Sequence, residues 1–127
     1  MGALNGRGSG SRLLKMAEAR RIRIDLSAPI LTETIRVLRE KFVWDGYRLH
    51  AARQMLLSLS NQVTPTQTLN VIAEDEADDR ILECAVEAGS EYIVTWDKDL
   101  LRLRTYEGIK IVTAPEFMKL IEPGRMR

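Results

Sequence analysis

Apolar residues along this chain recur with two periods, one typical of strands and one typical of helices. Residues 21–26 (RIRIDL) alternate isoleucine or leucine with charged residues, which predicts a strand with one buried face. The runs 91–95 (EYIVT) and 108–112 (GIKIV) predict two more strands. Apolar residues three or four positions apart predict helices at 11–20, 28–42, 46–60, 78–88, 98–103 and 115–121. The segment 62–72 is expected to be extended chain and loop.

Strands that alternate with helices favour a parallel sheet covered on both faces. We therefore expect an α/β, Rossmann-like three-layer fold with a mostly parallel central sheet. A single domain is expected at 11–121, between a flexible, glycine-rich N-terminus (1–10) and a loose C-terminal tail (122–127). Only three strands support this architecture, and the chain opens with a helix, whereas a doubly wound sheet opens with a central strand. The pattern is that of a fold truncated at its N-terminus by one strand.

Composition excludes several classes of function. The 127 residues carry a net charge of +1, so binding to nucleic acid would depend on local patches. The one cysteine, Cys84, lies among apolar residues, which favours a buried thiol over a disulfide or a thiolate zinc site. His50 is isolated, and a structural or solvated histidine is favoured over a catalytic one. No apolar run reaches membrane-spanning length and no signal peptide is recognisable, so a cytoplasmic protein is expected.

Acidic residues follow the predicted strands, where open parallel sheets bind their ligands. Glu33 comes after the first strand, and Asp97 and Asp99 come after the second. Asp78 falls within the apolar face of its helix, so that a helix cap and a cation ligand are equally good interpretations of it. Glu33 lies at the margin of an apolar arc, and for Glu33 alone an interaction with the helix dipole is favoured over a ligand role.

Five acids crowd into six residues between Glu74 and Asp79. One interpretation is a solvated acidic loop. The other is that some of these acids converge with Glu33 and Asp97 on a hard cation. Carboxylates without histidine or cysteine suit Mg²⁺ or Mn²⁺ and not zinc. Such an ion can activate water and stabilise the charge that builds on a phosphodiester.

The stretch 75–101 (DEADDRILECAVEAGSEYIVTWDKDLL) resembles the PIN domain family. It is most similar to the VapC-like branch, the toxin components of toxin–antitoxin systems. The segment 108–117 (GIKIVTAPEF) resembles that branch's ending, and 26–33 (LSAPILTE) resembles its strand-to-helix element. The resemblance covers residues 11–121.

This resemblance implies a metal-dependent endoribonuclease that uses Mg²⁺ or Mn²⁺. The family's catalytic and metal-binding acids would carry over to Glu33, Asp78 and Asp97. Asp99 would be an additional metal-binding acid, and Asp75 and Asp79 are weaker candidates. The resemblance also implies RNA as substrate, a cognate antitoxin protein as partner, a homodimer and no association with a membrane. Phosphates could be contacted by exposed cations, although plain solubility is favoured for each of them taken singly: Arg12, Lys15, Arg20, Lys98 and Arg102.

One departure from the family bears on activity. PIN domains begin with an apolar strand that ends in Asp-Thr-Asn or a similar motif, whereas no aspartate precedes Asp25 here. Either the start is assigned too late, or the chain lacks this strand and one metal ligand. A true loss favours an alternative function, that of a catalytically impaired remnant that binds an antitoxin or RNA. Such a chain is expected to fill the gap with a dimer partner's segment, an altered pairing or another strand.

Overall fold

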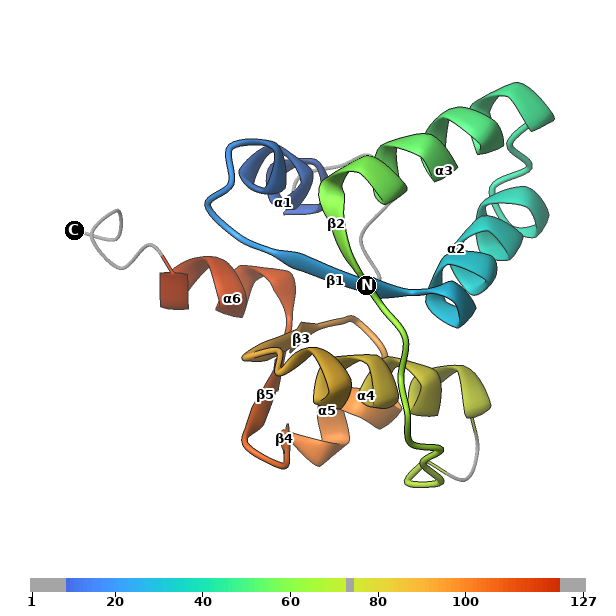
Figure 1. Cartoon of the computed structure of the whole chain (residues 1–127). Coiled ribbons are helices and arrows are strands. Elements are labelled where there is room, and N and C mark those ends of the chain that lie inside the picture. The colour runs from blue at the N-terminus through green and yellow to red at the C-terminus, as the bar shows by residue number, and fades with distance from the viewer. Residues whose placement is uncertain (1–8, 73–74, 122–127) are drawn as a thin grey trace.

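The computed structural model describes residues 9–72 and 75–121. Its N-terminal half contains helix α1 (Ser9–Glu18), strand β1 (Ile24–Ser27), helices α2 (Ala28–Glu40) and α3 (Gly46–Leu59), and strand β2 (Ser60–Val63). Strands β1 and β2 are parallel, and their register runs from Ile24 opposite Ser60 to Ser27 opposite Val63. Helices α2 and α3 form the connection between these two strands (Figure 1).

The C-terminal half contains helix α4 (Glu76–Ala88), strand β3 (Tyr92–Val94), helix α5 (Lys98–Leu103), strands β4 (Thr105–Tyr106) and β5 (Ile109–Val112), and helix α6 (Ala114–Ile121). These strands form a second sheet in the order β3-β5-β4, in which β3 and β5 are parallel and β4 is antiparallel to β5. Glu107 and Gly108 join β4 to β5 with φ angles of 47° and 83°. Positive φ at both central residues is characteristic of the tight turns that match the twist of a hairpin.

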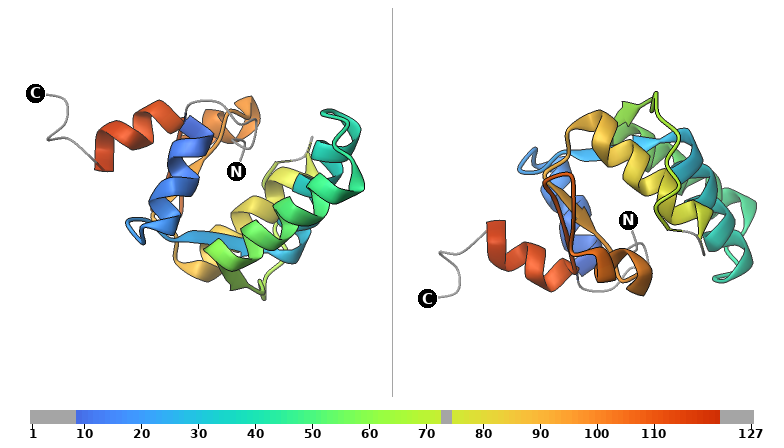
Figure 2. Two further views of the ribbon diagram at one scale, coloured as in Figure 1. Left: turned by 90° about the horizontal axis from the view of Figure 1, so that it is seen from above. Right: turned by 90° about the horizontal axis from the view of Figure 1, so that it is seen from below.

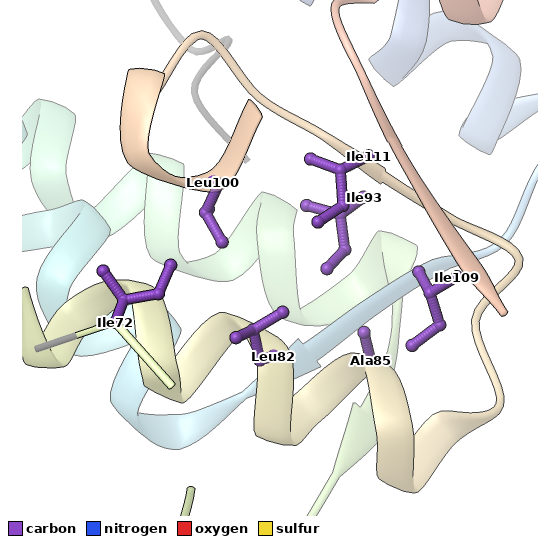
Figure 3. Packing of buried hydrophobic residues seen from close by; sticks show 7 residues of the cluster. All are labelled: Ile72, Leu82, Ala85, Ile93, Leu100, Ile109 and Ile111. Carbon is purple, nitrogen blue, oxygen red and sulfur yellow. The ribbon is translucent and has the colours of Figure 1, made fainter. Parts of the chain in front are cut away.

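The α/β class and the mostly parallel strand pairing are confirmed. Alternate residues of β3 and β5 face opposite layers, as the two-residue period of a strand requires. Ile93 and Ile111 pack against helices α4 and α5, together with Leu82 and Leu100 (Figure 3). On the other face, Tyr92, Val94 and Val112 pack with the apolar side chains of helices α1 and α6. Figure 2 shows α1 and α6 on one side of these strands and α4 on the other.

The strands form two sheets and not one continuous sheet. In the described part of the chain, β1 pairs only with β2, and β3 pairs only with β5. A cavity of about 530 Å³ lies between the two sheets. It is lined by residues 21–25, which lead into and include the start of β1, by residues 91–94 around β3, and by apolar side chains of α1 and α4. Two of the expected ways to fill the place of a missing strand, an altered pairing and an additional strand, are therefore wrong for the described residues. The third, a segment from a dimer partner, stays a prediction.

Several predicted boundaries move by a few residues. The first strand begins at Ile24 and not at Arg21, because Arg20 takes a φ of 59° and the Arg21 amide closes the end of α1 on the Met16 carbonyl at 2.9 Å. Strand β2 overlaps the end of the helix predicted at 46–60 and the start of the loop predicted at 62–72. Strand β4 was not predicted. Ser9 and Gly10, expected to be flexible, belong to α1. The rest of the predicted N-terminus and the whole predicted tail lie outside the described residues.

Candidate metal centre

Asp97 is held at the carboxyl end of β3 by its role as a helix cap. Its Oδ1 accepts hydrogen bonds from the backbone amides of Asp99 and Leu100, at 2.9 and 3.0 Å, at the start of α5. Its own amide donates to Oγ1 of the buried Thr95 at 3.0 Å. A capping aspartate satisfies amides that a helix leaves unpaired at its N-terminus. These bonds leave the other carboxylate oxygen of Asp97 available to a ligand.

Asp75 and Asp78 occupy the first turn of α4. Asp75 is the cap residue, and its Oδ1 accepts from the Ala77 amide at 2.9 Å. Asp78 lies three residues further on, and residues at this spacing share one side of a helix. The Asp78 side chain is buried, with 4% of the residue exposed, and its Oδ2 has no hydrogen-bond partner in the described structure. An unsatisfied buried carboxylate oxygen is costly unless it binds a proton or a cation.

The fold brings Asp75, Asp78 and Asp97 together. One carboxylate oxygen from each residue lies within 4.8 Å of the others. Two of these residues come from the start of α4 and the third from the start of α5, so the cluster joins two helix N-termini next to the end of β3. Among the three, Asp75 was only a weaker candidate from the sequence. The three-residue spacing between Asp75 and Asp78 at a helix start was the signal that could have raised it.

The crowding of these acids changes the protonation of Asp78. The pKa of Asp78 is raised from its ordinary value of 3.8 to about 7; burial is the largest cause, and the Asp97 carboxylate and the charges of Asp75 and Asp99 contribute to the same rise. Both causes disfavour a second and third negative charge in a small volume. Without a cation, Asp78 therefore stays mostly protonated below neutral pH and is only partly ionised at pH 7.

The neighbouring acids on α4 have structural partners. Asp79 is buried, and its Oδ1 accepts hydrogen bonds from the amides of Val71 and Ile72, both at 2.9 Å. Glu83 is also buried, and its Oε2 accepts from the Leu69 amide at 2.7 Å and from Arg80 at 2.8 Å. Both carboxylates thus hold the loop that precedes α4 against the helix. Glu74 lies outside the described residues.

Glu33 and Asp99 lie differently from the three clustered aspartates. The Glu33 carboxylate binds the guanidinium of Arg36 on the same face of α2, and Glu33 is not one of the three residues whose oxygens lie within 4.8 Å. Asp99 forms an ion pair with Arg102 at 3.2 Å, although its charge still acts on Asp78. The structure therefore brings Asp78 and Asp97 together and adds Asp75. Metal-binding roles for Glu33 and Asp99 stay predictions.

The donor set fits a small hard cation. Mg²⁺ binds oxygen ligands at about 2.1 Å, so oxygens on opposite sides of the ion are about 4.2 Å apart. One carboxylate oxygen from each of Asp75, Asp78 and Asp97 lies within 4.8 Å of the others, a spacing at which the three residues could share one ion. The unpartnered Oδ2 of Asp78 is the atom that gains most from a cation. Neither a histidine nor a cysteine belongs to this group in the described part of the chain, which excludes a zinc-type donor set there.

The remaining candidates have ordinary roles. Cys84 is buried, and burial raises the pKa of its thiol to about 11, so it stays protonated and unreactive. His50 is exposed on α3. The five cations considered for phosphate binding are all exposed, and Arg102 pairs with Asp99. None of the helices in residues 9–72 and 75–121 has the length and apolarity to cross a membrane.

Comparison with known proteins agrees with this arrangement. The family model of the PIN domain matches residues 2–99, which include the three clustered aspartates. No curated protein and no solved structure matches the chain. PIN domains are generally nucleases, and they generally use a divalent metal ion. Since the match covers most of the sequence and the fold has the expected α/β organisation, the chain belongs to the PIN domain family.

Proposed function

We propose that this protein is a metal-dependent endoribonuclease that hydrolyses RNA phosphodiester bonds, with Mg²⁺ or Mn²⁺ as its cofactor. The observation that carries the proposal is the convergence of Asp75, Asp78 and Asp97, with a buried and unpartnered oxygen on Asp78. A chain with ordinary structural acids would pair or expose that oxygen, as it pairs those of Asp79 and Glu83. Membership of a family of nucleases supports the same conclusion.

The three aspartates would hold the ion between the starts of α4 and α5. A bound divalent ion supplies two things, a water of lowered pKa as nucleophile and compensation for the charge that builds on the phosphate. Asp97 is oriented by its two capping hydrogen bonds, so that its position does not depend on the ligand. Asp78 would hold the ion as a carboxylate, because a bound cation would offset the negative charges that raise its pKa. Glu33 and Asp99 are proposed as additional acids of the site, as the family resemblance implies.

The test is a titration of Mn²⁺ against the purified chain, followed by calorimetry and by cleavage of a mixed RNA. Asp78→Asn and Asp97→Asn should lose both metal binding and cleavage. Asp45→Asn is a matched control, because Asp45 also caps a helix, by accepting from the Arg48 amide at 2.9 Å, but lies outside the cluster. Asparagine caps helices as well as aspartate does, so this control should keep full activity. Cleavage that survives in Asp78→Asn and Asp97→Asn would refute the proposal.

A second candidate function is a binding module that holds an antitoxin or RNA without cleaving it. The observation that favours it is that only three acids cluster among the described residues, while Arg36 engages Glu33. Fewer carboxylates bind a divalent ion less tightly. A well-folded protein that binds RNA or an antitoxin, but neither binds Mn²⁺ nor cleaves RNA, would make this second function the correct one.

We further propose a toxin of a toxin–antitoxin system, acting in the cytoplasm as a homodimer and neutralised by a small antitoxin protein. The support for these points is the resemblance of residues 75–101 and 108–117 to that branch of the family, together with a single buried thiol that suits a reducing compartment. Light scattering of the purified chain measures the oligomeric state. Growth arrest on expression, lost in Asp97→Asn, is the expected result for a toxin, and normal growth with active enzyme would contradict it.

A further inference from the structure

Two strands of this fold each have an open edge at the same cavity. In the described part of the chain, β1 pairs only with β2, and β3 pairs only with β5. The residues that lead into and begin β1 (21–25) and those around β3 (91–94) line one cavity of about 530 Å³. Each of the two strands therefore has one edge paired within its own sheet, and its other edge has no strand beside it.

The pairing of β3 with β5 identifies the backbone groups on the open edge of β3. The Glu91 carbonyl and the Thr95 amide both bond to β5, at 3.0 and 2.9 Å. In a parallel ladder, the residues of a strand direct their backbone groups alternately to one edge and to the other. Ile93 therefore also bonds to β5, whereas the amides and carbonyls of Tyr92 and Val94 point to the open edge. Both of these residues line the cavity.

Side chains, and not backbone ladder bonds, connect β1 to the chain before β3. The Asp25 Oδ2 accepts a hydrogen bond from the Ser90 Oγ at 2.6 Å. The Arg23 Nη2 donates to the Ala88 carbonyl at 3.0 Å. Both contacts lie at the amino ends of the two strands, so they close the cavity there and fix the two open edges relative to each other.

The size and the lining of the cavity fit one short strand. A strand residue takes up about 160 Å³, from a rise of about 3.3 Å, a strand spacing of about 4.8 Å and a layer thickness of about 10 Å. The cavity of about 530 Å³ thus has room for about three such residues, and β3 is three residues long. Apolar residues of α1 and α6 line it on one side and apolar residues of α4 on the other (Figure 2). A strand buried between two such layers is apolar on both faces.

We propose that this cavity is a binding site for an extended segment of another protein, which adds a strand of three or four apolar residues between β1 and β3. The backbone of this segment bonds to both open edges, including the amides and carbonyls of Tyr92 and Val94. Its side chains pack alternately against α4 and against α1 with α6. This inference goes beyond the proposed nuclease function and does not depend on it.

A different protein suits the site better than a second copy of this chain or a lipid tail. Strands β1, β3 and β5 contribute side chains to the protein's own apolar clusters, so a copy that lent one of them would lose part of its core. Strands β2 (SNQV) and β4 (TY) lack an apolar run. A lipid tail fills an apolar cavity but leaves the backbone groups of both edges unpaired, which is costly once water is displaced.

Amide hydrogen exchange on the whole chain tests the pairing residue by residue. The probes are synthetic peptides with two, three, four or six consecutive valine and isoleucine residues between flanking lysines. Affinity should rise with the length of the apolar run and level off at about four residues, because the cavity holds no more. Binding should slow exchange at Tyr92 and Val94 about 10-fold more than at Ile93, whose amide already bonds to β5. A peptide N-methylated at alternate residues should bind about 10-fold more weakly, since it lacks donors along one edge.

Two leucines provide a matched pair of variants. Leu14 and Leu57 are both partly buried against the same apolar cluster, but only Leu14 lines the cavity. Leu14→Trp should narrow the cavity and weaken peptide binding by about 10-fold, whereas Leu57→Trp should bind normally. Circular dichroism identifies a variant that fails to fold, and the exchange measurement on the unsubstituted chain then decides the question.

The outcomes separate this inference from other occupants and from the proposed function. Saturable binding with protection of Tyr92 and Val94 would support it, whether or not the protein cleaves RNA. Binding without that protection would overturn it and leave an apolar pocket only, and so would equal binding of the N-methylated peptide. No binding of any peptide by the folded chain would overturn it as well. A dimer in light scattering that the peptide converts to monomers would show that a second copy occupies the site, against the proposal of a different protein.

Discussion

The chain contains two parallel strand pairs, and the acidic residues that follow their first strands make different contacts. After β3, Asp97 caps α5 with one oxygen and lies within 4.8 Å of Asp75 and Asp78. After β1, Glu33 lies on α2 and binds Arg36. The strand-to-helix topology is the same in both halves, yet only the C-terminal half contributes to the cluster. The Glu33 carboxylate pairs with a cation of its own helix, whereas the Oδ2 of Asp78 has no hydrogen-bond partner in the described structure.

Substitution within the cluster should have the largest effect. Asp78→Asn and Asp97→Asn remove charge from the site but keep the shape of the side chain, and we expect each to lower the rate of RNA cleavage by about 100-fold or more. Initial rates at saturating Mn²⁺ measure this loss. Circular dichroism at 222 nm should stay unchanged, and an unfolded variant would not count as support.

Loss of Asp79 should destabilise the protein, although Asp79 is the direct neighbour of Asp78. Asp79→Ala leaves the amides of Val71 and Ile72 without their acceptor, and we expect a cost of about 2–4 kcal/mol in the free energy of unfolding. Urea denaturation measures the change. Asp79→Asn keeps an acceptor oxygen and should cost less. Equal stability of Asp79→Ala and wild type would show that the loop before α4 does not depend on this contact.

The N-terminal pair has its own structural carboxylate, Asp25 of β1. Burial alone would raise the pKa of Asp25, but hydrogen bonds from Arg23, Ser90 and Asn61 outweigh it and lower that pKa below the ordinary value of 3.8. The contribution of Asp25 to stability is thus present above the unfolded pKa and is lost as pH falls through the folded one. Asp25→Ala should cost about 1–3 kcal/mol at pH 7 and less in acid. A cost that does not depend on pH would contradict this account.

Asp78 should make the stability of the metal-free protein depend on pH in the opposite direction. Its folded pKa of about 7 lies above the ordinary value of 3.8, so the folded state binds the extra proton, and stability falls as pH rises between these values. Asp78→Asn should remove this slope and raise the melting temperature in EDTA at pH 8 by roughly 5 °C. Scanning calorimetry of both proteins from pH 4 to pH 8 tests this. Parallel melting curves would refute the crowding of charges.

The smallest effect is expected at Glu33. If Arg36 keeps its carboxylate, Glu33→Gln should lower cleavage by less than about 10-fold. A loss as large as that of Asp97→Asn would break the comparison between the two strand pairs. It would show that Glu33 leaves Arg36 when the cation binds, and Arg36→Gln should then tighten Mn²⁺ binding.

Local pattern was sufficient for most of the fold. The six predicted helices are present, because apolar spacing and caps such as Asp45, Asp97 and Gly89 act within a few residues. Strands β3 and β5 were also recognised from their buried alternation. Strand β2 was missed, since its sequence, SNQV, has only one strand-forming apolar residue and becomes a strand through its pairing with β1. Strand β4 was missed because two residues are too few to show a period.

The sequence by itself determined the α/β class, the family, and the candidacy of Asp78 and Asp97, because period, helix caps and motif spacing are properties of short segments. Only the tertiary structure decided which acids share a site. Asp75 joins the cluster, Asp79 turns to the backbone of the preceding loop, and Glu33 stays with Arg36. The cavity between the two sheets is likewise a tertiary result. The physical reason is that Asp78 and Asp79 carry the same side chain, so the sequence does not tell them apart. Their roles differ because the fold places different groups within a few ångströms of each carboxylate.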